Sequence, residues 1–170
     1  SIDGQLVSLH DLENFHYASD FSGMDCGSYS IKNMITHATK LTHHWLCDNN
    51  PKVLKFLRRN YPDIHNSKKI FSDVRRRPVG IWHKHIDFYL AGPPCQGFSS
   101  AGGQSMWSGF RSRLYFQSIA TIITCLPKIA MIENSVNIDT NGGVIVARIT
   151  LLLANAGYHV SNVRINTHNH

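Results

Sequence analysis

The sequence lacks the features that would place it in a membrane or on a secretion pathway. None of its apolar runs approaches the roughly 20 residues that a helix needs to span a bilayer. The first residues, Ser1-Ile-Asp-Gly-Gln-Leu6, carry no basic patch followed by an apolar stretch, so no signal peptide is indicated. No linker, repeat or low-complexity tract divides the 170 residues, and this length suits one domain with a sizeable core.

Cysteine is scarce, and no C-x-x-C pair occurs. The four cysteines are Cys26, Cys47, Cys95 and Cys125. Such spacing is neither a zinc signature nor a disulfide framework, and it suits a reducing compartment. The eleven histidines include the pairs His43-His44, His83-x-His85 and His168-x-His170, but none has a matching second pair at zinc-finger spacing. We therefore expect no metal site.

Acidic residues are also few, with 11 Asp and Glu against 17 Lys and Arg and a net charge of +6. The basic residues cluster at Arg58-Arg59, Lys68-Lys69, Arg75-Arg76-Arg77, Arg111 and Arg113. A basic domain favours polyanionic partners. Charge runs of this kind are equally typical of solvated surfaces, so charge alone leaves nucleic-acid binding as one of two interpretations.

Extended and helical patterns alternate along the chain. The predicted strands cover residues 14–21, 41–47, 69–72, 86–91, 129–132 and 158–165. Helices are predicted through Ile31 and Met34, after Asn50, and over residues 111–126 and 144–156. Asn50-Pro51 is typical of a helix start, Pro127 ends a helix, and Gly157 is a C-cap. The alternation predicts an α/β fold with a doubly wound, mostly parallel sheet.

The most informative segment is Ala91-Gly-Pro-Pro-Cys-Gln-Gly-Phe-Ser-Ser100, which follows a predicted buried strand. Proline fixes φ and donates no hydrogen bond, so Pro93 and Pro94 hold the sulfur of Cys95 in a narrow range of positions. The loop lies at the carboxyl edge of the sheet, where ligands bind in such folds. A turn that happens to contain a cysteine is the alternative interpretation.

Acidic residues follow other predicted strands at the same edge. The first strand leads into the turn Phe21-Ser-Gly-Met-Asp-Cys-Gly27, Asp48 follows the second strand, and Asp73 follows the third. Each carboxylate on its own fits a helix cap or turn equally well. Together they favour an adenosine-containing ligand. There is no Walker loop and no dinucleotide glycine pattern, so phosphate is not the indicated ligand.

Glu133-Asn134 ends the fifth predicted strand. A glutamate that enters a loop after an apolar strand is partly desolvated, which favours its protonated form and makes it a candidate proton donor. A cap on the following segment is the alternative role.

Together these residues resemble the cytosine-C5 DNA methyltransferases. Gly92-Pro-Pro-Cys-Gln-Gly-Phe-Ser99 resembles the catalytic loop of that family, and Ile132-Glu-Asn134 resembles its second catalytic motif. Phe21-x-Gly23 is similar to the start of the cofactor motif. Arg111-x-x-Leu114 is similar to the segment that follows the catalytic loop. The resemblance covers nearly the whole chain in the order of the family, and it implies a Rossmann-like, S-adenosylmethionine-dependent methyltransferase fold.

The resemblance also implies a role for each matching residue. The catalytic residues would be Cys95 and Glu133. The residues at the cofactor would be Phe21, Gly23, Asp48, Asp73, Val74, Pro94 and Leu114, with Asp48 at the ribose and Asp73 at the adenine. The residues at DNA would be Gln96, Ser99 and Arg111.

The implied reaction is methyl transfer from S-adenosylmethionine to C5 of a cytosine flipped out of duplex DNA. Glu133 would polarise the ring at nitrogen 3 while the Cys95 thiolate attacks C6. C5 then takes the methyl group, and loss of its proton expels the thiolate. The thiol must be ionised, which requires an electropositive, partly exposed loop.

Some positions depart from the family pattern. The turn reads Gly23-Met-Asp-Cys-Gly27 where the family commonly has a Gly-Gly pair, Ser135 replaces a valine, and Gly109 stands where an acidic residue often occurs. The chain stops before the Gln-x-Arg-x-Arg motif, the last strand, the target-recognition region and the C-terminal cofactor motif. We therefore expect residues 1–170 to be the amino-terminal part of a catalytic domain, inactive alone, and nuclear in a eukaryote or cytoplasmic in a bacterium.

Three alternatives stay open at this point. The same chemistry could act on RNA, as in the tRNA-directed branch of the fold. A non-catalytic nucleic-acid-binding or allosteric relative is suggested by the altered turn, where Asp25 and Cys26 add side chains next to a cofactor. A cysteine hydrolase is disfavoured, because no histidine follows Cys95 in a recognisable context.

Overall fold

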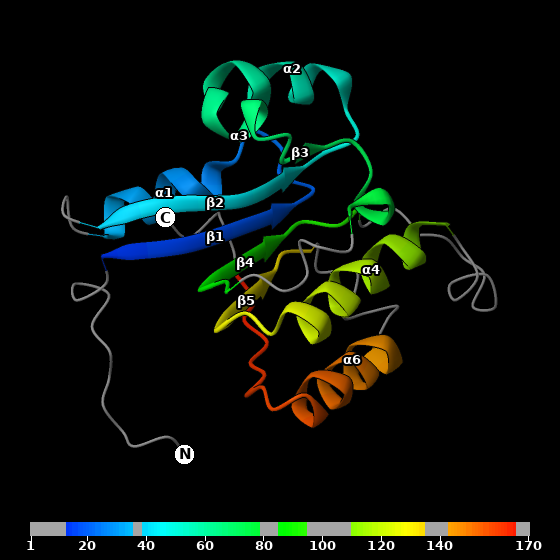
Figure 1. Ribbon diagram of the computed structural model, residues 1–170. Coiled ribbons are helices and arrows are strands. Elements are labelled where there is room, and N and C mark those ends of the chain that lie inside the picture. The colour runs from blue at the N-terminus through cyan, green and yellow to red at the C-terminus, as the bar shows by residue number, and fades with distance from the viewer. Residues whose placement is uncertain (1–12, 36–38, 79–84, 95–109, 135–142, 166–170) are drawn as a thin grey trace.

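Five parallel strands form one sheet in the order β3-β2-β1-β4-β5 (Figure 1). The computed structural model describes residues 13–35, 39–78, 85–94, 110–134 and 143–165. The strands are β1 (Asn14–Asp20), β2 (Lys40–Cys47), β3 (Ile70–Phe71), β4 (Phe88–Ala91) and β5 (Ile129–Ile132). The helices are α1 (Cys26–Met34), α2 (Pro51–Asn60), α3 (Pro62–Asn66), the 3₁₀ turn η2 (Val74–Arg76), α4 (Phe110–Cys125) and α6 (Gly143–Asn155).

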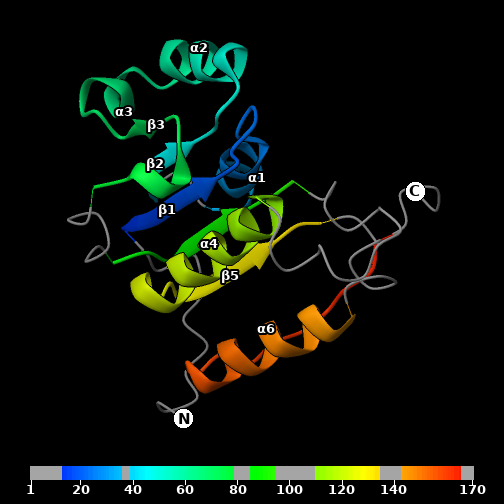
Figure 2. The same cartoon turned by 90° about the vertical axis from the view of Figure 1, so that its right-hand side faces the viewer.

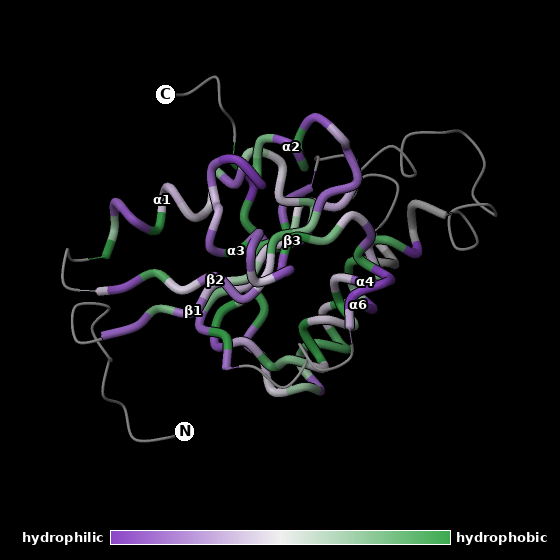
Figure 3. The backbone as a smooth tube through the Cα atoms, turned by 45° about the horizontal axis from the view of Figure 1, so that its top comes forward, coloured by the Kyte–Doolittle hydropathy of each residue, from purple (hydrophilic) through white to green (hydrophobic). Residues whose placement is uncertain are grey.

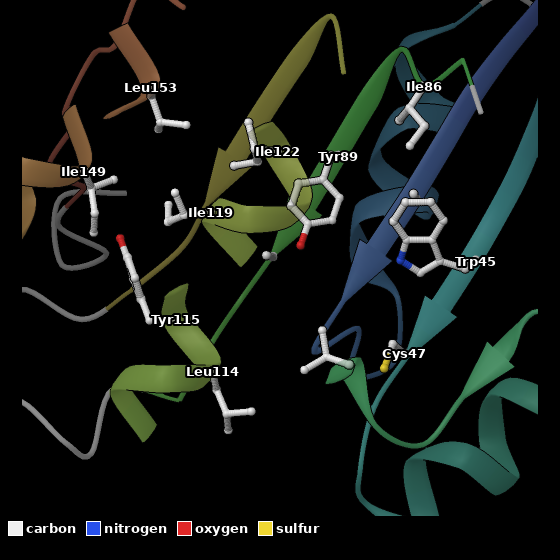
Figure 4. Packing of buried hydrophobic residues seen from close by; sticks show 13 residues of the cluster. Trp45, Cys47, Ile86, Tyr89, Leu114, Tyr115, Ile119, Ile122, Ile149 and Leu153 are labelled. Atoms are coloured by element: carbon white, nitrogen blue, oxygen red, sulfur yellow. The ribbon is translucent and has the colours of Figure 1, made fainter. Parts of the chain in front are cut away.

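Helices cover both faces of the sheet, which confirms the doubly wound α/β fold. Figure 2 shows α4 and α6 on one side of the strands and α1 on the other. β1 runs through the centre, so side chains that alternate along it enter two separate cores. Ala18 joins the core under α4 and α6, whereas Tyr17 joins the core under α1, α2 and α3. Figure 4 shows the first core, with Tyr89 of β4 between Trp45 of β2 and Ile122 of α4.

The local signals in the sequence act as expected. The Asn50 side chain accepts a hydrogen bond of 2.9 Å from the backbone N–H of Lys52, and Pro51 opens α2. This N-cap satisfies a donor that the first turn of a helix leaves unpaired. α4 ends at Cys125, two residues before Pro127. Gly157 follows α6 with a φ of +94°, the conformation of a glycine C-cap.

The predicted sixth strand is wrong. Residues 158–165 carry no secondary structure, and Val163 and Ile165 are exposed. A cavity of about 440 Å³ lies between this segment and β5, with Ala130, Met131 and Ile132 on its β5 side. Neighbouring strands must lie about 5 Å apart to pair. Among the described residues, the segment therefore has no partner strand at pairing distance.

Gly27 of α1 packs too tightly against the sheet to accept a side chain. A Cβ at this position would overlap the Leu90 side chain and lie 2.7 Å from the Tyr17 hydroxyl. Overpacking of this kind costs about 1–3 kcal/mol. We expect Gly27→Ala in the intact protein to lower the free energy of unfolding by that amount in a denaturant titration.

Gly143 supplies the matched control, because a Cβ there meets nothing within 4 Å. In Gly143→Ala the added methyl restricts the unfolded chain, and stability should stay level or rise by up to about 1 kcal/mol. Equal stability of the two variants would contradict the tight approach of α1 to β1 and β4.

Candidate functional site

The five strands end in register at one edge of the sheet. Asp20 at the end of β1 pairs with Cys47 of β2 and with Ala91 of β4. Cys47 in turn pairs with Phe71, and Ala91 with Ile132. The residues that follow each strand are therefore brought to the same edge. This explains why predicted site residues that are far apart in sequence lie together.

The strand order reverses between β1 and β4. β1 continues into β2 and β3 on one side, and β4 continues into β5 on the other. Ligands of open α/β sheets bind at such a switch point, beyond the carboxyl ends of the strands. The turn that begins at Phe21 follows β1, and the segment Gly92-Pro-Pro94 follows β4. The two loops singled out in the sequence thus flank the switch point.

A cavity of about 80 Å³ collects most of the predicted cofactor residues. Its lining contains Phe21, Asp48, Asp73, Val74 and Leu114, together with Cys47, Asn49, Ser72 and Arg75. Gly23 is adjacent, because its N–H donates to Oδ2 of Asp48 at 3.0 Å. Typical small-molecule sites exceed about 300 Å³. The described residues therefore enclose only part of a ligand, such as one ring.

Asp48 ties two elements of the site together. Its Oδ2 accepts from Gly23 in the turn after β1, and its Oδ1 accepts from the backbone N–H of Asn50 at 2.8 Å, just before α2. Ser22 adds a second tie, because its backbone N–H donates to the carbonyl of Cys47 at 2.9 Å. The turn is thus fixed against the end of β2, and Asp48 holds it while lining the cavity.

Asp73 is held by Arg75 on both carboxylate oxygens. The guanidinium donates from Nε to Oδ1 at 2.9 Å and from Nη2 to Oδ2 at 2.7 Å, and the backbone N–H of Arg75 also donates to Oδ1. The side-chain hydrogen bond from Arg75 is the main reason that the pKa of Asp73 falls to about 2. A carboxylate held in this way presents fixed, ionised acceptors to the cavity.

The two side chains that replace a Gly-Gly pair do not line the cavity. Asp25 is 1% exposed and adopts a φ of +57°, and its Oδ1 accepts from the Tyr17 hydroxyl at 2.8 Å. His43 Nε2 lies 3.4 Å from its Oδ2. The Asp25 carboxylate is therefore directed into the core under α1. Cys26 is exposed and is also absent from the cavity lining.

Glu133 lies beside the start of the loop that leads to Cys95. Its backbone N–H donates to the carbonyl of Ala91 at 2.9 Å, and its Oε2 lies 3.6 Å from where a Cβ of Gly92 would stand. The expectation of partial desolvation is wrong, because Glu133 is exposed. β5 is the last strand of the described sheet, so no further strand covers the residue that follows it.

The other predicted site residues are only partly described. Pro93 is buried and Pro94 is half-buried. Cys95, Gln96 and Ser99 lie outside the described residues, and Arg111 lies in α4 without a described side chain.

Of the described cysteines, Cys47 lines the cavity, but burial raises the pKa of its thiol, and burial also raises the pKa of Cys125 to about 11. Neither is an activated nucleophile.

The histidine pair His43-His44 does not form a joint site. His43 lies beside Asp25 under α1, whereas His44 Nε2 lies 3.0 Å from Nδ1 of His16. Successive residues of a strand point to opposite faces, which separates the two rings. Within the described parts of the chain, no three His, Cys, Asp or Glu side chains are grouped to hold a metal ion.

Sequence reasoning missed a buried carboxylate behind the site, Asp20. It is fully buried at the end of β1 and forms an ion pair of 2.9 Å with Arg77 Nη2. Burial raises the pKa of Asp20, while Arg77 and the hydrogen bonds from Tyr89 and Trp45 oppose that rise. The sequence groups Arg77 with the basic clusters, which suit a solvated surface or a nucleic-acid contact, but neither interpretation holds for Arg77 because its side chain is fully buried. An aspartate at the end of a buried strand was the available signal.

The fold and the site define a class: a Rossmann-like α/β protein with a small cavity at the carboxyl edge of its parallel sheet. Comparison with protein families narrows this class. The profile of the C-5 cytosine-specific DNA methylases matches residues 17–169. The chain belongs to this family, which confirms the resemblance of its motifs.

Curated relatives agree with the family. The chain is 35% identical over 83 residues to type II methyltransferase M1.HphI of Haemophilus parahaemolyticus, covering 47% of the chain and 22% of the relative. It is 29% identical over 116 residues to type II methyltransferase M.AgeI of Thalassovita gelatinovora, covering 65% and 27%. It is 35% identical over 101 residues to type II methyltransferase M.BanI of Aneurinibacillus aneurinilyticus, covering 56% and 24%. The matches thus span about a quarter of each relative.

None of the helices in the described ranges is long and apolar enough to cross a membrane.

The Arg75–Asp73 pair predicts a specific response to acid. A depressed pKa means that the pair stabilises the fold above the unfolded-state value of 3.8, and that this contribution is lost as the pH falls to about 2. We expect Arg75→Met to lower the melting temperature only slightly above pH 4, since the pair is exposed and solvent screens it. The deficit should disappear near pH 2. A deficit of the same size at pH 7 and pH 2 would contradict the ionised pair.

Proposed function

We propose that the protein containing this chain is a DNA cytosine-C5 methyltransferase, which transfers a methyl group from S-adenosylmethionine to C5 of a flipped cytosine through a covalent bond between Cys95 and C6. One observation carries the proposal. Five side chains identified in the sequence as cofactor contacts line one cavity, at the edge of the sheet where β4, the strand that leads to Cys95, also ends. Family membership supports the substrate, and the chemistry of the edge supports the mechanism.

The donor set of the cavity suits a nucleoside. Asp48 and Asp73 supply carboxylate oxygens that accept hydrogen bonds from ribose hydroxyls and from an exocyclic amine. Phe21, Val74 and Leu114 supply apolar surface for a planar ring. S-adenosylmethionine, when bound, supplies an electrophilic methyl group on a sulfonium. The cavity residues would hold the nucleoside part, and the loop after β4 follows the strand that pairs with β1 at the same edge of the sheet.

The residues after β4 and β5 act on the cytosine in this proposal. The Cys95 thiolate forms a bond to C6, and the ring electrons shift toward C5, which takes the methyl group. Once the flipped cytosine covers the Glu133 carboxyl group, its protonated form is favoured, and Glu133 donates a hydrogen bond or proton to nitrogen 3, so that negative charge does not accumulate on the ring. A water molecule acting as base then takes the C5 proton, which re-forms the C5–C6 double bond, breaks the bond from sulfur to C6 and expels the thiolate. The position of the Glu133 carboxylate next to Gly92 supports a joint action with the Cys95 loop.

The covalent step is tested with duplex DNA that carries 5-fluorocytosine at the target base. Fluorine cannot leave C5 as a proton does, so the thiolate stays bonded to C6. The intact protein should form a complex stable in denaturing gels when S-adenosylmethionine is present. Cys95→Ala should form none, and Glu133→Gln should slow methyl transfer about 10²- to 10⁴-fold on normal DNA.

Two outcomes contradict this mechanism. One is a wild-type protein that binds both DNA and S-adenosylmethionine without an adduct. The other is equal adduct formation by Cys95→Ala. Methyl transfer to tRNA in place of duplex DNA would keep the mechanism and replace the substrate. The non-catalytic alternative loses its main support, because Asp25 is buried away from the cavity instead of lining it.

The outer flank of the sheet offers contacts for the DNA backbone. The basic flank consists of the exposed residues Lys52, Lys55, Arg58, Arg59, Lys68 and Arg76 on α2, after α3 and on η2. Figure 3 shows that the α2 and α3 region is largely hydrophilic. α2, α3 and β3 pack together, so Lys52, Lys55, Arg58, Arg59 and Lys68 belong to one side of the molecule, whereas η2 with Arg76 packs against α4. Such a surface suits phosphate contacts that bind without reading sequence.

A salt titration tests the basic flank. Each phosphate contact adds about 0.9 to the slope of log K against log salt concentration. We expect Lys55→Gln/Arg59→Gln in the intact protein to reduce the slope for non-target duplex DNA by about 1.8. Lys128→Gln is the control, because Lys128 lies at the opposite edge of the sheet, paired with Asp87 at 2.9 Å. Equal slopes for all three proteins would remove the basic flank from the DNA interface.

A further inference from the structure

A fully buried ion pair lies directly behind the cofactor cavity. Asp20 Oδ2 and Arg77 Nη2 are 2.9 Å apart, and both side chains have no exposed surface. Asp20 also accepts from Trp45 Nε1 at 3.0 Å and from the Tyr89 hydroxyl at 2.6 Å. Three donors from three elements therefore converge on one carboxylate. Neither Asp20 nor Arg77 lines the cavity.

Each partner of the pair is bonded to a wall of that cavity. Asp20 is followed directly by Phe21, which forms the wall after β1. Arg77 Nε donates to the carbonyl of Val74 at 3.2 Å, which forms the wall at η2. The ion pair therefore connects the backbone at Phe21 with the backbone at Val74 without itself lining the cavity.

A third wall depends on the same guanidinium. Arg77 Nη2 donates to Thr121 Oγ1 of α4 at 2.9 Å, and the first turns of α4 carry Leu114. The guanidinium also lies 4.8 Å from the Trp45 ring. A planar fork with several fixed donors can meet all these partners at once, which a lysine cannot. One side chain thus connects the elements that carry Phe21, Val74 and Leu114.

We propose that Asp20 and Arg77 are positioning residues, whose ion pair sets the separation of the Phe21, Val74 and Leu114 walls and thereby the affinity for the nucleoside part of the methyl donor. This role rests on the proposed function. It is separable from stability, because a buried ion pair replaced on both sides by apolar residues of similar size often leaves a fold as stable as before. Apolar replacements pack, but they do not fix the Val74 carbonyl and Thr121 in place.

The test compares the intact wild-type protein with Asp20→Leu/Arg77→Met. Melting temperature reports the fold, calorimetry reports the dissociation constant for S-adenosylmethionine, and steady-state rates separate KM from kcat. A misplacement of about 1 Å at a site costs up to about 10²-fold. We expect cooperative unfolding near the wild-type temperature, a dissociation constant and KM for the methyl donor raised about 10- to 100-fold, and kcat within about threefold.

Two further variants keep the result decisive. Arg77→Lys retains the charge and loses the fork, so it should raise the dissociation constant even where the double variant does not fold. Leu57→Ala is the control for stability alone, because Leu57 is fully buried in the core on the other face of the sheet. It should lower the melting temperature and leave the dissociation constant unchanged.

The outcomes separate this role from the proposed function. A folded double variant, or a folded Arg77→Lys, with wild-type affinity for S-adenosylmethionine overturns the positioning role only. A rise in the dissociation constant of Leu57→Ala equal to that of Arg77→Lys also overturns it, since general loosening then explains both. A wild-type protein that binds no S-adenosylmethionine overturns the positioning role together with the proposed function.

Discussion

The buried pair between Asp20 and Arg77 is the interaction on which the arrangement of this site depends. Two charges are held out of water at the carboxyl end of the central strand. Leaving either one alone would cost about 3–5 kcal/mol, so the two residues constrain each other strongly. Because Arg77 follows η2 and also bonds Thr121 of α4, that constraint reaches from β1 across the edge of the sheet to two other elements. Asp20 and Arg77 therefore fix the geometry of the cavity, although neither residue lines it.

The in-register ends of the strands explain why the sequence was informative about the site. The strand periods, the Asn50 cap and the alternation of elements are local signals, and they were sufficient to place Phe21, Asp48 and Asp73 at one edge. The sequence did not predict how far each side chain is buried. Arg77 belongs to a run of three arginines, yet only contacts with β1 and α4 make it a buried residue. Glu133 follows an apolar strand, yet the place of β5 at the edge of the sheet leaves it exposed.

The wrong sixth strand has a related cause. The apolar residues Tyr158, Val160, Val163 and Ile165 favour a strand, but strand formation requires a neighbour within pairing distance, and this is a property of the fold. This segment and β5 both line a cavity of about 440 Å³, and the segment does not join the sheet. Local pattern therefore predicted the five strands that have a pairing partner, including β5 residue for residue, and failed for the segment without one.

The turn after β1 is held by two carboxylates from opposite faces of the sheet. Asp20 bonds to Trp45, Tyr89 and Arg77 under α4, whereas Asp25 bonds to Tyr17 under α1. A turn built on glycines has no side chains to anchor it and depends on backbone conformation alone. Here the φ of +57° at Asp25 is compensated by a buried hydrogen bond, which allows a non-glycine residue in a left-handed conformation. The departure from the family pattern is therefore consistent with a competent turn, because the added carboxylate stabilises it from the core and leaves the cavity side to Phe21 and Gly23.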